Sequence, residues 1–574
     1  MSDQITVEFD VPASMRDGVV LRANVFHPAG DGRYPVALTR TPYGKDYASV
    51  TPFLDAPRLA RAGYIVVIQD VRGRFRSEGE WTPFKHEAED GYDTVEWAAR
   101  LPGANGNVGM FGASYYGFTQ WMAAKAAPPS LKAIVPAITW ADARDGLVWR
   151  GGALELGVQA FWYLNALALD IAVKRTQGRP PAEQFQAIGA VVREIDRLRG
   201  EGYRSLPLKD FEPLKRVDLL SDLQEVIANA ENPEYYAPSS IADSYEQVQV
   251  PSLNIGGWYD IYPAPTLRNF RTMRTSGSTP AARQSKVLIG PWSHTNYSNT
   301  VGDIDFGFAA QMALMNMQTD LTGLTQRWFD YWLKGIDNGI AQEPPVKIFV
   351  MGENAWRDEQ EWPLARAQSA PFYLHSGGAL SAERPGDEPP DQYTYDPADP
   401  TPTYGGNMLM HILYGPGAKD QRLVEARPDV LSYTTAPLVQ DIEVTGPLVV
   451  KLWAASDAPD TDFVARLVDV HPDGFAQNLA DGIIRARYRN GAVPEPIEPG
   501  QVYEYTIDLW ATANVFKADH ALRVDIASAS FPRWDRNPNT GAPFAQDAEL
   551  RPARQTILHD AAHPSHIVLP IVPR

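Results

Sequence analysis

Cysteine is missing altogether from the 574 residues of this chain. Its absence excludes a disulfide framework, a thiolate metal site and a cysteine nucleophile. It also fits a reducing compartment, and we expect the protein to act in the cytoplasm. The first twenty residues carry acidic side chains and no central apolar segment, so we predict no signal peptide there.

Basic residues are fewer than acidic ones. The chain contains 52 Lys and Arg and 70 Asp and Glu, which gives a formal net charge of −18. Nucleic acids and anionic membranes are bound by basic surfaces, so we expect neither as a partner. Long apolar runs are scarce too, and none approaches the length of a membrane span. The chain length predicts about three or four domains.

The order of strand and helix patterns predicts an α/β fold in which one domain is interrupted by another. Residues 1–141 hold unalternating apolar runs between helical stretches, which is typical of a parallel sheet covered on both faces. Helical spacing dominates residues 142–242, interpreted as an inserted cap, and the strand rhythm returns over residues 243–353. Residues 354–574 contain short alternating runs between prolines and glycines, which indicates a C-terminal β-sandwich or jelly roll.

A serine follows one of these apolar runs, in the stretch GASYYG at residues 112–117. Small residues around Ser114 allow a strand to turn sharply into a helix, as in the nucleophile elbow that holds a serine hydroxyl clear of a sheet. The alternative is a tight glycine turn followed by a serine N-cap. The motif alone does not decide, because its second glycine, Gly117, stands three residues after the serine rather than two.

Two loops further along supply the partners that a serine nucleophile needs. Asp260 follows one buried-type strand and His294 follows the next, so the chain order is Ser, Asp, His, as in α/β-hydrolases. A serine hydroxyl is a weak nucleophile, so an imidazole must accept its proton and a carboxylate must orient the imidazole. Taken singly, a turn-forming aspartate or a structural histidine explains each residue as well. Their placement after successive strands favours a triad.

Acyl transfer also needs hydrogen-bond donors for the oxyanion. The backbone N–H after the nucleophile, that of Tyr115, is the usual first donor. The second comes from the loop after an early strand, here RTPYGK at residues 40–45, which presents the Tyr43 hydroxyl. Aromatic packing in a Pro-Tyr-Gly turn is the alternative for Tyr43. The pair His563 and His566 has no evident third ligand, so we expect neither a metal nor another cofactor.

Motifs from one end of the chain to the other match a single family. They are RDGV (16–19), RTPY (40–43), VIQDVRG (67–73), GNVGMFGASY (106–115), GGWYD (256–260), GPWSH (290–294), FVMG (349–352), DTDF (460–463) and HPSHIVLP (563–570). By these motifs the chain resembles the bacterial cocaine esterase-like serine hydrolases, in the family that includes X-Pro dipeptidyl-peptidases, acylases and α-amino-acid ester hydrolases.

The resemblance implies an α/β-hydrolase domain, an inserted helical cap and a C-terminal jelly roll, with the active site where the three meet. It implies Ser114 as nucleophile, His294 as general base and acid, and Asp260 as the residue that orients the histidine. It also implies the Tyr43 hydroxyl as an oxyanion donor beside the N–H of Tyr115, which favours that role over simple packing.

An acyl pocket is implied as well, at Trp149, Trp162, Tyr262, Leu409 and Met410. Tyr262 and Met410 stand where the esterase pattern has phenylalanines, which makes the expected pocket more polar and more pliable. The segment after Asp260, IYPAP, lacks the acidic residues that would hold a substrate ammonium group. A neutral ester is therefore favoured over an amino-acid ester.

The combined prediction is a serine carboxylesterase that cleaves a neutral small-molecule ester, with an aromatic acyl or aryl group, through an acyl-enzyme. An X-Pro-type peptidase or amide acylase of the same family is the alternative. A third hypothesis is a non-catalytic protein whose jelly roll binds a glycan. A homodimer is left open.

Overall fold

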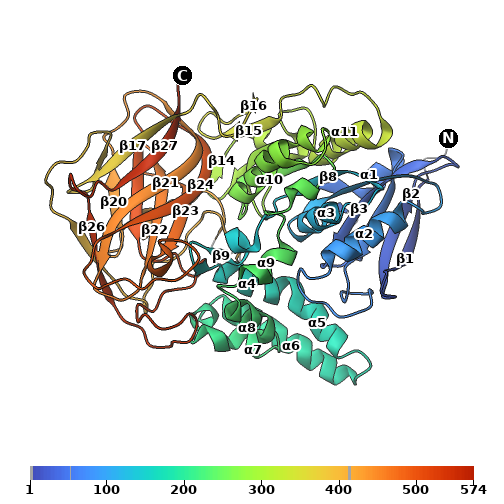
Figure 1. Cartoon of the computed structure of the whole chain (residues 1–574), viewed down its shortest axis with the longest axis horizontal. Helices are drawn as coiled ribbons and strands as arrows, with labels where there is room; N and C mark the ends of the chain where they lie inside the picture. Colours follow the sequence, from blue (N-terminus) through green and yellow to red (C-terminus); the bar gives the residue numbers. More distant parts are fainter. Residues whose placement is uncertain (1–3, 49, 52, 411–414) are drawn as a thin grey trace.

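The computed structural model describes residues 4–574, except residues 49, 52 and 411–414. A mainly parallel sheet with covering helices and a β-rich region lie at opposite ends of the molecule, and a layer of helices runs beneath the place where they meet (Figure 1). The N-terminus is at the end with the parallel sheet and the C-terminus belongs to the β-rich end.

The first sheet has ten strands in the order β1-β2-β6-β3-β7-β8-β11-β12-β15-β16. Neighbours from β6 to β15 run parallel, and antiparallel strands close both edges. The bounds are β1 Thr6–Ser14, β2 Val20–His27, β3 Tyr34–Thr41, β6 Ile65–Asp70, β7 Ala104–Ala113, β8 Leu131–Ala137, β11 Leu253–Tyr259, β12 Lys286–Ser293, β15 Val346–Val350 and β16 Ala355–Glu359.

Helices cover both faces of this sheet, so its central strands are buried on both sides. Strands β6, β11 and β12 are buried along their whole lengths, which explains their unalternating apolar sequences. Consecutive residues of β7 show the two faces, because Met110 packs with Phe118 while Phe111 packs with Phe329 in a separate core. The covering helices are α1 Ala56–Arg61, α2 Glu87–Ala98, α3 Tyr115–Ala126, α10 Pro263–Ser276 and α11 Leu321–Lys334.

The chain between β8 and β11 is helical, as the spacing predicts. One part of it, Leu156–Arg175, is long and apolar enough to cross a membrane by length and composition, contrary to the expectation that no run would be. More than half of its apolar window, 56%, is buried inside the protein, so it packs as a core helix does. The α- and π-helices are η2 Ala143–Leu147, α4 Leu156–Phe161, η3 Trp162–Leu167, α5 Ala168–Arg175, α6 Pro181–Leu198, α7 Glu212–Lys215, α8 Leu220–Ala228 and α9 Pro233–Tyr236. Four 3-10 helices, η4 Gly202–Arg204, η5 Leu208–Asp210, η6 Ala237–Ser239 and η7 Tyr245–Gln247, and the short strands β9 Trp149–Arg150 and β10 Ala153–Leu154 complete the described part of this segment.

The C-terminal region is an eleven-stranded, almost entirely antiparallel sheet around its own core. Burial alternates along much of β21, as the short alternating runs predict. The bounds are β17 Gln368–His375, β18 Ala379–Ser381, β19 Asp391–Tyr395, β20 Leu431–Thr434, β21 Ile442–Ser456, β22 Asp462–Val470, β23 Ala476–Arg485, β24 Tyr503–Phe516, β25 Ala521–Ala527, β26 Ala553–Leu558 and β27 His566–Val572, with the short helix α12 Arg422–Glu425.

One predicted boundary is wrong. The first domain was expected to end at residue 353, but β16 pairs antiparallel with β15 from Val350 and Ala355 onward and extends the first sheet to Glu359. The glycine and asparagine near residue 353 form the turn of this hairpin, with positive φ at Gly352 and Asn354, rather than a linker between domains.

Candidate active site

Ser114 stands alone between the end of β7 and the start of α3, in a backbone conformation with φ 56° and ψ −121°. This conformation is crowded for a residue with a side chain. A Cβ on Gly112 would lie 2.6 Å from Cβ of Tyr116, and one on Gly117 would lie 2.8 Å from Cβ of Thr139. Both glycines are therefore required by the close approach of strand and helix. The Ser114 side chain makes no capping hydrogen bond to α3, which removes the N-cap alternative.

The three residues of the predicted triad lie within hydrogen-bond distance in the predicted order. Nε2 of His294 is 3.1 Å from Oγ of Ser114, and Nδ1 of His294 is 2.6 Å from Oδ1 of Asp260. The Asp260 side chain is fully buried, and its second oxygen accepts a hydrogen bond of 3.0 Å from the backbone N–H of Tyr262. The Tyr297 hydroxyl donates to the carbonyl oxygen of His294 and anchors the histidine loop.

These residues meet because each follows a strand of the same parallel sheet. Ser114, Asp260 and His294 come directly after β7, β11 and β12. The carboxyl ends of parallel strands share one edge of a sheet, where ligands of such sheets bind. The arrangement can support nucleophilic attack by the serine with the histidine as proton acceptor.

Tyr43 lies at the same site, and its hydroxyl has a defined orientation. The indole N–H of Trp162 donates to the Tyr43 oxygen at 2.8 Å, so the phenolic proton remains available for another acceptor. Burial raises the pKa of Tyr43, so its hydroxyl stays protonated. A hydrogen bond with the Ser114 side chain acts in the opposite direction and lowers this pKa by a smaller amount. Both residues line the same cavity.

Tyr115 contributes to the site through its backbone N–H and through its side-chain hydroxyl. As the first residue of α3 it has a backbone N–H without an acceptor inside the helix. Its hydroxyl donates to Oε1 of Glu87 at 2.9 Å, and Oε2 of Glu87 accepts from the Arg40 guanidinium at 2.7 Å. All three side chains are buried, and burial raises the pKa of the Glu87 carboxyl. This buried chain of hydrogen bonds, absent from the sequence predictions, anchors the start of α3.

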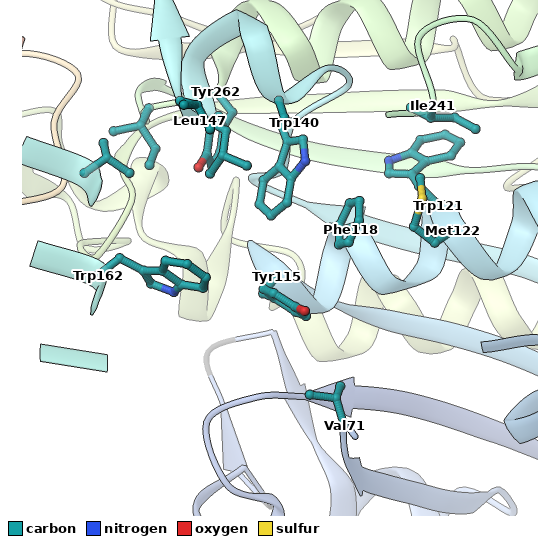
Figure 2. Close-up of a cluster of buried hydrophobic side chains, with 14 of the residues drawn as sticks. Val71, Tyr115, Phe118, Trp121, Met122, Trp140, Leu147, Trp162, Ile241 and Tyr262 are labelled. Atoms are coloured by element: carbon teal, nitrogen blue, oxygen red, sulfur yellow. The ribbon is translucent and has the colours of Figure 1, made fainter. Parts of the chain in front are cut away.

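A narrow cavity of about 10 Å³ lies beside Ser114. Figure 2 shows Trp140, Trp162 and Tyr262 gathered around Tyr115. Among the described residues, none that lines the cavity carries a charge. The lining residues are Tyr43, Phe84, Ser114, Tyr115, Trp140, Leu147, Val158, Trp162, Tyr262 and Leu409.

Of the five predicted pocket residues, Trp162, Tyr262 and Leu409 line this cavity, whereas Trp149 and Met410 do not. Trp149 pairs with β10, its indole N–H donates to the Tyr236 hydroxyl at 2.9 Å, and its ring packs edge to face against Phe544. Met410 packs against α4, where its sulfur would lie 2.5 Å from a Cβ on Gly157. Neither residue therefore forms part of the cavity lining.

Sequence reasoning missed four lining residues: Phe84, Trp140, Leu147 and Val158. Phe84 has φ 68° and stacks on Tyr115 and Trp162 at ring-centroid distances of 5.3 and 5.5 Å. Nothing in its turn-rich sequence neighbourhood indicates this position. Trp140 follows β8 closely, and its place after a parallel strand is a signal that could have identified it.

The β-rich region reaches the site through Asn407. Its side-chain Nδ2 donates to the carbonyl oxygens of Trp258, at 2.8 Å, and of Asp260, at 2.5 Å. Asn407 is buried, with an exposed fraction of 4%. The loop that carries Asp260 is thus held from the far side by a residue about 150 positions further along the chain.

Two family models cover most of the chain. Residues 17–296 match the X-Pro dipeptidyl-peptidase (S15 family) model, and residues 338–568 match the X-Pro dipeptidyl-peptidase C-terminal non-catalytic domain. The cocaine esterase of Rhodococcus sp. (strain MB1 Bresler) is 38% identical over 99% of both chains. The chain belongs to the X-Pro dipeptidyl-peptidase S15 family.

Two solved structures resemble this chain over nearly its whole length. An α-amino acid ester hydrolase matches over 100% of this chain and 98% of its own, with a TM-score of 0.82 and 25% identity. An aminopeptidase from a marine sediment archaeon, Thaumarchaeota archaeon, matches over 99% and 97%, with a TM-score of 0.80 and 26% identity. The predicted fold class and family resemblance are confirmed.

Proposed function

We propose that this S15-family protein is a serine carboxylesterase that cleaves a neutral small-molecule ester through an acyl-enzyme. The observation that carries the proposal is the connected set of Ser114, His294 and Asp260, with the serine held in a strained elbow. Full-length similarity to a cocaine esterase and to an α-amino acid ester hydrolase supports ester hydrolysis.

In the acylation step, Oγ of Ser114 attacks the ester carbonyl while Nε2 of His294 accepts its proton. The buried Asp260 carboxylate accepts the Nδ1–H of His294, holds the ring in the required tautomer and stabilises the imidazolium. The imidazolium then protonates the leaving alcohol. In the second step a water molecule, deprotonated by the same histidine, releases the acid and restores the serine.

The tetrahedral intermediates carry a negative oxygen that needs two donors. The Tyr115 N–H, free of any helical acceptor, supplies one. The Tyr43 hydroxyl supplies the other, because its oxygen already accepts from Trp162 and its proton is left to point at the substrate. A phenol with a raised pKa donates without losing its proton.

The side chains around the narrow cavity beside Ser114 support a neutral aromatic acyl or aryl group as the recognised part of the ester, which the cavity admits once these side chains move apart. Its described lining is aromatic and aliphatic, without a carboxylate that would hold an ammonium group. Flat aromatic groups also stack favourably against walls such as Trp140 and Trp162.

The test is labelling of the purified protein with a fluorophosphonate, together with hydrolysis of phenyl and nitrophenyl esters. We expect Ser114→Ala to abolish labelling and to lower kcat by about 10⁶-fold. Ser293→Ala, which changes another buried serine close to the site in sequence, is the matched control and should still be labelled. Labelling or turnover that survives Ser114→Ala contradicts the proposal.

An X-Pro-type peptidase or amide acylase is the second candidate, favoured by the description of the family model over residues 17–296. Turnover of X-Pro-anilides at a higher kcat/KM than that of phenyl esters would replace the first proposal with this one. Cytoplasmic location and a homodimer stay predictions, for which cell fractionation and sedimentation of the purified protein are the measurements.

A further inference from the structure

Outside the active site, three potential metal ligands converge at one end of the β-rich region. Asp469, His471 and His520 each offer a ligand atom, and these three atoms lie within 4.8 Å of one another. Asp469 is buried, while the two histidines are partly exposed. The group therefore has one buried metal ligand and two metal ligands that solvent can reach.

The register of two strands explains why these residues meet. Strand β22 ends at Val470, which pairs antiparallel with Ala521 at the start of β25. The next positions outward are His471 and His520, so the two imidazoles face each other across the strand ends. Asp469 and His471 are two residues apart and point to the same face. The rings of the two histidines lie with centroids 4.5 Å apart and planes inclined by 34°.

Neighbouring side chains orient each of the three groups. Oε1 of Gln477 accepts from Nε2 of His471 at 3.3 Å, which leaves Nδ1 of that ring with a free lone pair. Nδ2 of Asn514 donates to Oδ2 of Asp469 at 3.2 Å. Nδ1 of His520 lies 2.8 Å from Oδ1 of Asp469 and leaves Nε2 free. Such outer partners, which fix the tautomer and direction of a ligand, accompany metal sites in proteins.

From this geometry we propose that Asp469, His471 and His520 bind a divalent transition-metal ion of the Zn²⁺ class, with water completing the coordination. Two imidazoles and one carboxylate suit Zn²⁺ better than Ca²⁺ or Mg²⁺, which prefer oxygen ligands. Tetrahedral ligands around Zn²⁺ lie about 3.4 Å apart. The three ligand atoms now lie within 4.8 Å of one another, and small rotations of the partly exposed imidazoles would bring them to the shorter spacing.

Such an ion joins β22 to β25 and the loop between β22 and β23. The Gln477 amide that contacts His471 also donates to the Tyr259 hydroxyl at 3.1 Å. Tyr259 is the last residue of β11, directly before Asp260. The proposed ion therefore stabilises the β-rich region on the side that contacts the strand bearing Asp260.

The experiment uses the full chain stripped of metal with a chelator and titrated with Zn²⁺ by calorimetry. We expect one Zn²⁺ per chain, a higher Tm in its presence, and, with Co²⁺ in its place, visible absorption bands of a nitrogen- and oxygen-coordinated ion. His471→Phe keeps an aromatic ring beside Phe475 and His520 but removes a ligand. Asp469→Asn keeps the shape but removes the charge. Each should weaken Zn²⁺ binding by about tenfold or more.

His86→Ala, at an exposed histidine far from the group, is the control and should bind Zn²⁺ as the unchanged protein does. If His471→Phe fails to fold, Asp469→Asn and the Co²⁺ spectrum carry the test. The proposal is overturned if the chain binds no Zn²⁺, if Ca²⁺ or Mg²⁺ binds equally well, or if binding is unaffected by both substitutions, as it would be for an ion held at His294.

Discussion

Two histidine–carboxylate pairs in this molecule look alike at close range. In one, Nδ1 of His294 is 2.6 Å from Asp260, and in the other Nδ1 of His520 is 2.8 Å from Asp469. Both carboxylates are buried. The pairs differ in the third group beside the histidine. Ser114 lies at the second nitrogen of His294, whereas the ring of His520 lies beside another imidazole, that of His471.

The difference comes from the sheets that carry the pairs. Parallel strands bring three separate loops to one edge, and the strained turn after β7 places a hydroxyl against the histidine. Antiparallel strands instead set neighbouring residues opposite each other, so His471 and His520 become a facing pair of ligands. The same hydrogen bond thus serves proton transfer in one setting and ligand orientation in the other.

The largest expected effect separates the two pairs by activity. Asp260→Asn should lower kcat for phenyl esters by about 10⁴-fold, because the amide no longer holds His294 in the tautomer that accepts the serine proton. Asp469→Asn should leave kcat nearly unchanged. Steady-state kinetics of both variants, with circular dichroism as a check on folding, decides the matter. Equal losses of activity would mean that the pairs are not functionally distinct.

Tyr43→Phe removes the proposed oxyanion donor of the first pair's site, and with it the acceptor of the Trp162 indole N–H. We expect kcat to fall by about 10²- to 10³-fold with little change in KM, because the donor acts on the transition state. Tyr297→Phe, which removes a hydroxyl that bonds to the His294 carbonyl, is the comparison and should cost less. A rise in KM without a fall in kcat after Tyr43→Phe would assign the hydroxyl to substrate binding instead.

Asn407→Ala tests whether the β-rich region supports the Asp260 loop. The substitution leaves the buried carbonyl oxygens of Trp258 and Asp260 without their side-chain donor, and we expect the free energy of unfolding to fall by about 1–3 kcal/mol. Denaturant titration measures this loss. A smaller fall in kcat should accompany it, and unchanged values of both would show that the loop holds itself in place.

The smallest effect is a pH dependence of the second pair. The hydrogen bond to Asp469 raises the pKa of His520 above its ordinary value of 6.5. A group whose pKa is raised on folding stabilises the protein fully below its unfolded pKa, and this contribution is lost as pH rises through the folded pKa. The difference in Tm between the unchanged protein and Asp469→Asn should therefore shrink as pH rises above about 6.5 in metal-free buffer. If the difference in Tm grows with pH instead, the pKa of His520 is not raised on folding and the prediction is wrong.

Much of the fold follows from local sequence patterns. Apolar runs such as the one before Asp260 mark strands buried on both faces, and the residue after each run lies at the sheet edge where the active site forms. The boundary at residue 353 failed because a glycine-containing turn looks the same in a hairpin as in a linker. Pairing between strands, which local patterns do not contain, distinguishes the two.

The pocket walls were harder to predict than the triad. Phe84 reaches the cavity from a loop and stacks on Tyr115 and Trp162, whereas Trp149 bonds to Tyr236 and does not line the cavity. Rotamers and loop paths are set by contacts between distant segments. A residue's type and position alone therefore do not reveal which side of a wall it lines.

By itself, the sequence determined the strand-to-loop positions of Ser114, Asp260 and His294 and the role each side chain can take, because these depend on local periodicity and on the chemistry of each side chain. Only the tertiary structure decided that Trp162 orients the Tyr43 hydroxyl, that Asn407 holds the Asp260 loop, and that three ligands meet at the ends of β22 and β25. Hydrogen bonds have a short range and strict geometry, so such contacts between distant parts of a chain exist only once its layers have packed together.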